Sequence, residues 1–79
     1  MTQEAYLLIS VESGREREIL ETLKMSEYVD EAFILFGQYD ILAKVKCDDK
    51  DELKVCISTI KALDGIGDIK TLEVADVVV

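Results

Sequence analysis

The fold is decided by residues 32–45, AFILFGQYDILAKV, in which two apolar runs flank a glycine, a tyrosine and an aspartate. Both runs are rich in residues that favour β-strands, and Gly37 can take a positive φ without steric cost. The stretch therefore predicts a β-hairpin that turns at Gly37 and Gln38. Tyr39 and Asp40 bring a hydroxyl and a carboxylate to the mouth of this hairpin, where they either stabilise the turn or contact a ligand.

The hairpin lies in the middle of a longer pattern of strands. Strands are predicted at residues 4–11, 29–36 and 39–47, and from about residue 68 to residue 79. The first of these carries apolar side chains at both alternating sets of positions, so both of its faces favour burial. The last ends in three valines, Val77 to Val79, which read as an apolar extension of the strand.

Two helices are predicted between the strands. Ser13 and Glu16 have the spacing of a capping box, which predicts a helix that begins near Gly14. Asp49 can cap the second helix, and Gly65 ends it. The apolar stripes are Ile19, Leu20 and Leu23 in the first helix and Leu53, Cys56, Ile57, Ile60 and Leu63 in the second.

The order of elements, β-α-β-β-α-β, predicts an α+β, ferredoxin-like fold across residues 1–79 as one domain, with a four-stranded antiparallel sheet and both helices on one face. The other face of the sheet would then expose apolar side chains from the first, second and fourth strands. A patch of this kind is rare on monomers. We therefore expect at least a dimer that forms through the sheet, with the valine-rich C-terminus adding to the partner's edge.

Composition narrows the possible functions. The chain has 9 Lys and Arg against 17 Asp and Glu, a net charge of −8, so direct nucleic-acid binding is not expected. The absence of histidine removes the side chain that titrates near neutrality and the commonest transition-metal ligand. We expect no catalytic residues, metal or cofactor.

The two cysteines, Cys47 and Cys56, have no zinc or redox spacing and are expected to be small buried side chains in a reducing compartment. No signal peptide or membrane span is visible, so the sequence predicts a cytoplasmic protein without membrane contact.

The strand order, the G-x-Y-D pattern of residues 37–40, and Gly65-Ile66 leading into a strand with Thr71 together resemble the ligand-binding domain of the Lrp/AsnC family, also called the RAM domain. The resemblance implies a module that drives dimerisation and higher assembly and binds an amino acid effector between dimers. In full-length members this domain follows a helix-turn-helix that binds DNA. Here the first strand starts within a few residues of Met1, so we expect a stand-alone form that modulates full-length relatives through mixed assemblies.

The resemblance also assigns roles to individual residues. Gly37 would let the hairpin backbone approach the ligand, with Gln38 beside it, and Tyr39 would form a wall of the pocket. Asp40 would bind the ligand's ammonium or hold the loop by accepting backbone N–H bonds, and Thr71 would supply a hydroxyl. Many relatives carry a second Ser or Thr two residues before Thr71, where this chain has Ile69.

Two other functions stay open at this point. An assembly module without a ligand would need only the two-faced sheet. A small ferredoxin-like enzyme of the acyl-phosphate hydrolase type would need an arginine in an anion-binding loop and a water-orienting amide. The chain has no asparagine, and its two arginines, Arg15 and Arg17, lie in the first predicted helix. Enzymatic activity is therefore not expected.

Overall fold

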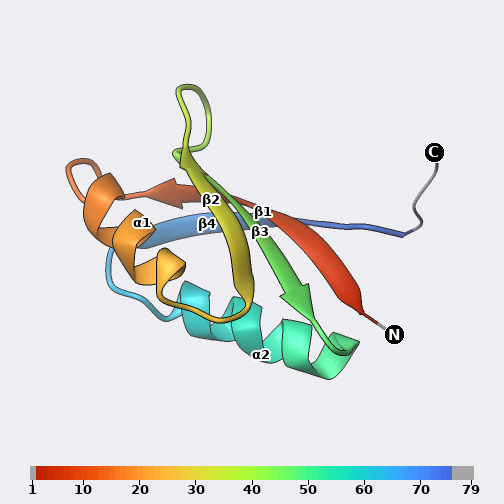
Figure 1. Cartoon of the computed structure of the whole chain (residues 1–79). Helices are drawn as coiled ribbons and strands as arrows, with labels where there is room; N and C mark the ends of the chain where they lie inside the picture. Colours follow the sequence, from red (N-terminus) through yellow and green to blue (C-terminus); the bar gives the residue numbers. More distant parts are fainter. Residues whose placement is uncertain (1, 76–79) are drawn as a thin grey trace.

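The computed structural model describes residues 2–75, in which four strands form one sheet and two helices pack on it (Figure 1). The elements are β1 (Gln3–Val11), α1 (Glu16–Lys24), β2 (Val29–Ile34), β3 (Ile41–Cys47), α2 (Lys50–Lys61) and β4 (Ile66–Glu73). The strand order is β2-β3-β1-β4, and every neighbouring pair is antiparallel. This confirms the predicted α+β, ferredoxin-like fold.

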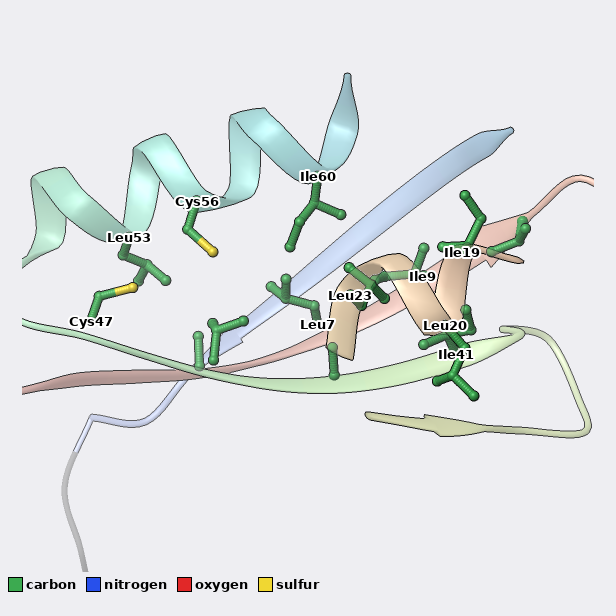
Figure 2. Packing of buried hydrophobic residues seen from close by; sticks show 14 residues of the cluster. Leu7, Ile9, Ile19, Leu20, Leu23, Ile41, Cys47, Leu53, Cys56 and Ile60 are labelled. Carbon is green, nitrogen blue, oxygen red and sulfur yellow. The ribbon is translucent and has the colours of Figure 1, made fainter. Parts of the chain in front are cut away.

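The hydrophobic core lies between one face of the sheet and both helices (Figure 2). Alternate residues of the two central strands are buried, as the period of a β-strand requires. The buried residues are Ala5, Leu7, Ile9 and Val11 of β1, Ile41, Ala43, Val45 and Cys47 of β3, Ile19, Leu20 and Leu23 of α1, and Leu53, Cys56 and Ile60 of α2. Both predicted helical stripes therefore face the core.

The opposite face of the sheet, here called the open face, carries Tyr6, Leu8, Phe33, Leu42 and Leu72. Residues directly opposite in an antiparallel pair share a face, and the register places Tyr6 opposite Leu72, and Phe33 opposite Leu42. Tyr6 is 37%, Phe33 51% and Leu72 45% exposed. Residues 2–75 of one chain therefore leave this apolar surface uncovered, as the sequence predicted.

The start of α1 differs from the prediction. The helix begins at Glu16, with Arg15 at the N-cap position and no side-chain cap, so the expected cap by Ser13 is wrong. Gly14 has φ +90° and turns the chain, and its N–H donates to the Glu16 carboxylate oxygens at 3.1 and 3.2 Å. The Glu12 N–H donates to the Gly65 carbonyl at 2.8 Å. This bond holds the loop against the turn between α2 and β4, so that the helix begins later in the sequence than predicted.

Several strand boundaries also shift. β2 ends at Ile34 instead of residue 36, and β3 begins at Ile41 instead of residue 39, because a bond from the Leu35 N–H to the Asp40 carbonyl, at 2.8 Å, closes a wider loop. β4 begins at Ile66, two residues earlier than predicted, and it ends at Glu73, so the described residues 74 and 75 are not part of the predicted strand. The expected valine extension at residues 77–79 lies outside the described residues. The predicted cap of α2 by Asp49 is confirmed, since its carboxylate accepts the Glu52 N–H at 2.8 Å.

Cys47 and Cys56 are free thiols buried in the core, as predicted. Burial raises the pKa of the Cys56 thiol to about 11, and burial also raises the pKa of the Cys47 thiol. Both thiols therefore stay neutral in the folded chain at pH values where an exposed thiol, with a pKa near 8.5, already ionises.

This pKa difference predicts a loss of stability at alkaline pH. Above about pH 8.5 the unfolded chain releases thiol protons that the folded chain retains. The contribution of the thiols to the free energy of unfolding is therefore fully present below that pH and is lost as the pH rises towards 11. Guanidinium unfolding in the presence of a reductant, from pH 7 to pH 10, measures the slope. The double variant Cys47→Ala, Cys56→Ala should show a shallower slope than the parent chain. Equal slopes in the two proteins would contradict the assignment to the thiols.

Candidate functional site

The loop between β2 and β3, residues 35–40 and here called the hairpin loop, is fastened to the end of β1 by Asp40. The Asp40 carboxylate oxygen Oδ2 accepts the Val11 N–H at 2.7 Å, and the Asp40 N–H donates to the Ile9 carbonyl at 2.9 Å. Oδ1 makes no hydrogen bond to residues 2–75. Asp40 thus holds the loop and keeps one oxygen available for a further donor.

Val11 is available to Asp40 because β1 is irregular at Ser10. The β1–β3 pairing extends only to Ile9, and the β1–β4 register shifts between Ile9 and Val11. The Ser10 hydroxyl accepts the Asp68 N–H at 2.7 Å, and a Cβ atom at Gly67 would lie 2.7 Å from the Ser10 hydroxyl oxygen. A side chain at position 67 would therefore require the Ser10 hydroxyl to shift, and the Asp40 carboxylate replaces a strand carbonyl as the partner of Val11.

The tip of the hairpin loop presents unused hydrogen-bond donors. None of the backbone N–H groups from Phe36 to Tyr39 donates to another residue in the range 2–75. Gly37 has φ +143°, and the space where its Cβ would lie is open. Gln38 is exposed and Tyr39 is partly buried. The loop therefore has the backbone freedom at Gly37 that the sequence predicted, together with four adjacent donors.

Thr71 is not part of this group within one chain. It lies in β4, opposite Leu7, on the face of the sheet that carries the helices, and it is exposed. The hairpin loop meets β1 at Ser10, whereas Thr71 pairs with Leu7. Asp40 and Thr71 are therefore separated by two strand spacings across the sheet and by three residues along the strands, a distance of about 14 Å. The structure therefore brings residues 37–40 together and leaves Thr71 apart from them.

A cleft of about 360 Å³ opens between the hairpin loop and the first turn of α1, and is here called the hairpin cleft. Its lining residues are Glu16, Arg17, Ile34, Leu35, Phe36 and Asp40. Of the predicted site residues only Asp40 reaches it. The sequence alone gave no sign that Glu16 and Arg17 would lie here, because both belong to a charge run that is typical of a solvated helix face.

A second cavity, of about 300 Å³, lies between α1 and α2 and is lined mainly by apolar side chains such as Leu23, Met25 and Val55. Its two threonines already donate to carbonyls of their own helices: Thr22 to Glu18 at 3.0 Å and Thr59 to Val55 at 2.8 Å. Since this lining is mainly apolar and carries no charged side chain, the groove suits a charged ligand less than the hairpin cleft does.

The part of the chain that the structure describes contains no cluster of three or more residues of the kind that hold a metal ion. Within the same range, 2–75, no helix has the length and apolar character needed to cross a membrane.

Comparison with known proteins agrees with this architecture. The structure of FFRP-DM1 superposes with a TM-score of 0.89 at 31% identity, over 94% of this chain and 99% of that one. AsnC of E. coli gives a TM-score of 0.88 at 29% identity, over 98% of this chain and 53% of that one. The HTH-type transcriptional regulator FL11 of Pyrococcus abyssi (strain GE5 / Orsay) is 27% identical over 62 residues, which are 78% of this chain and 41% of the regulator.

The chain thus spans about half or less of the two regulators that it matches. Residues 4–79 match the family model described as the Lrp/AsnC ligand binding domain, nearly the whole chain. The resemblance inferred from the G-x-Y-D hairpin and the strand order is thereby confirmed. This chain belongs to the Lrp/AsnC family and corresponds to its ligand binding domain.

Proposed function

We propose that this chain is a regulatory module that binds an amino acid effector at the hairpin loop and assembles into dimers and larger oligomers, with no catalytic activity. The observation that carries the proposal is the loop itself. In a chain of a ligand-binding family, a carboxylate with one unused oxygen directly follows, in the same loop, four consecutive backbone N–H groups without partners in residues 2–75. The Asp40 carboxylate complements the ammonium group of an amino acid, and the backbone N–H groups complement its carboxylate.

Each predicted residue has a role in this arrangement. Oδ1 of Asp40 accepts the ammonium group, while Oδ2 stays on the Val11 N–H and keeps the carboxylate in place. The N–H groups of the loop tip donate to the ligand's carboxylate, and the backbone at Gly37 and Gln38 allows a close approach because no side chain stands over Gly37. Tyr39 forms a wall of the site.

The Thr71 hydroxyl joins the site from another subunit. Within one chain it lies about 14 Å from Asp40, too far for one small ligand to contact both side chains. A site completed by a second subunit would make effector binding and assembly depend on each other, since each stabilises the other by mass action.

Dimerisation uses the open face of the sheet. Residues 2–75 of a single chain leave Tyr6, Phe33 and Leu72 exposed to solvent. A second copy placed sheet against sheet would bury them. The same surface supports the second candidate, an assembly module that binds no effector. In either case we propose that regulation arises through mixed assembly with longer Lrp/AsnC regulators.

Amino acid binding is tested by a thermal-shift screen of the twenty amino acids at millimolar concentration. At least one should raise the melting temperature, and Asp40→Asn should weaken its binding about tenfold, because the amide that keeps its oxygen on the Val11 N–H turns an NH2 donor, and no negative charge, towards the ammonium. Asp40→Asn keeps an oxygen for the Val11 N–H, so the fold should persist. Asp68→Asn, an exposed carboxylate at the same end of the sheet, is the control. If no amino acid stabilises the chain, the assembly module alone remains.

A further inference from the structure

We infer that the hairpin cleft completes the effector site: Arg17 binds the effector's carboxylate, and Ile34 and Phe36 hold an apolar side chain. The effector class is therefore an amino acid with an apolar side chain. This inference rests on the proposed function, and it adds a positively charged residue and a side-chain preference that residues 37–40 and Thr71 do not supply.

The two arginines of α1 have different surroundings. Arg15 is paired with Asp64 at 2.9 Å and with Glu18 at 3.2 Å, so its charge is already balanced. Arg17 forms no ion pair with any of residues 2–75, and its side chain lines the hairpin cleft. Arg17 is therefore the arginine that is available to an anionic group.

A positive charge matters here because the chain as a whole repels anions, with a net charge of −8. Glu16, the other charged residue that α1 places in the cleft, has both carboxylate oxygens near the Gly14 N–H, at 3.1 and 3.2 Å. Arginine presents a planar fork of donors that matches a carboxylate. Arg17 and the free N–H of Phe36, the one loop-tip residue that lines the cleft, can therefore share the two oxygens of the effector's carboxylate, while Asp40 takes the ammonium.

The remaining lining of the cleft is apolar. Phe36 is fully exposed, Ile34 is 39% exposed, and Leu35 is partly buried. Large apolar side chains gain by contact with an apolar group that removes them from water. The cleft volume of about 360 Å³ is in the lower part of the range of small-molecule sites, about 300 to 1,000 Å³. A single amino acid with an aliphatic or aromatic side chain suits this size and lining.

The test compares Arg17→Gln with Lys24→Gln, a cation of the same helix that does not line the cleft. Calorimetry with L-leucine, L-isoleucine, L-methionine and L-phenylalanine, alongside L-serine, L-lysine and L-glutamate, ranks the side chains. The tightest binder should be apolar. Arg17→Gln should weaken it about tenfold, whereas Lys24→Gln should change the affinity less than about twofold. The carboxamide of that amino acid should bind both variants equally, because it lacks the carboxylate.

The outcomes separate the inference from the proposed function. If an amino acid binds and Asp40→Asn weakens it, but Arg17→Gln has no effect or the tightest binder has a charged side chain, the inference is wrong and the proposed function stands. If none of the twenty amino acids binds, both are wrong. Arg17 is exposed and unpaired within residues 2–75, so Arg17→Gln should leave the melting temperature almost unchanged and report on binding alone.

Discussion

Replacing Leu7 by alanine is expected to lower the free energy of unfolding by about 3 to 5 kcal/mol. Leu7 is completely buried in β1 and lies in the middle of the core (Figure 2). The variant loses the transfer free energy of the removed atoms and leaves a cavity that the neighbouring strands and helices cannot close. Since domains of this kind are stable by about 5 to 15 kcal/mol, this single change removes a large share of the total.

Urea denaturation followed by circular dichroism measures this loss, and an unchanged slope against denaturant would show that the folded state stays intact. Leu8→Ala is the matched control, because Leu8 is the next residue of β1 and its side chain lies on the open face, only partly buried. At protein concentrations low enough to limit association, Leu8→Ala should cost less than half as much. An equal loss from both changes would contradict the view that the helix-covered face carries most of the stability.

The sequence was sufficient for the fold because its apolar positions follow two clear periods. Alternation in β1 and β3 predicted which residues enter the core, and three- and four-residue spacing did the same for both helices. The errors fall at element ends. Ser13 had the right spacing for a cap, but the Glu12–Gly65 hydrogen bond and the turn at Gly14 place the helix start two residues later.

The candidate site was only partly visible from the sequence. The G-x-Y-D pattern identified the hairpin, because glycine conformation and turn chemistry are local properties. Arg17 was not identifiable, since its place beside Ile34 and Phe36 depends on how the β1–α1 loop is held. At the Ser10 bulge, which presents the Val11 N–H to Asp40, the Ser10 hydroxyl accepts the N–H of Asp68 from a distant part of the chain. Contacts between residues far apart in sequence leave no periodic signal.

The same strand carries both the site and the proposed interface. β1 holds the hairpin loop through Ile9 and Val11, and it places the neighbouring residues Tyr6 and Leu8 on the open face. A ligand that fixes the hairpin loop would therefore act on an element that also belongs to the proposed contact between subunits. This arrangement gives a physical route for coupling between effector and assembly, and it makes the open face the second place where one substitution should have a large effect.

Leu72→Lys is expected to raise the dissociation constant of the dimer by about a hundredfold or more. Leu72 lies opposite Tyr6 on the apolar open face, so association through that face would bury its side chain. A lysine at position 72 would have to lose its hydration when the dimer forms. It would also lie close to two existing positive charges, Lys44 opposite Tyr6 and Lys70 opposite Leu8. In an interface with two-fold symmetry each substitution occurs twice, which doubles the penalty.

The folded subunit itself should tolerate this change, because β4 is an edge strand, Leu72 is 45% exposed, and lysine is common on such edges. Sedimentation velocity at micromolar concentration should therefore show a dimer for the parent chain and a folded species of 8.9 kDa for Leu72→Lys. Val55→Lys places the same charge on an exposed apolar position of α2, in the other layer of the molecule, and should remain dimeric. A monomeric parent chain would contradict dimerisation altogether. Dissociation by Val55→Lys but not by Leu72→Lys would show that the interface lies on the helices and not on the open face.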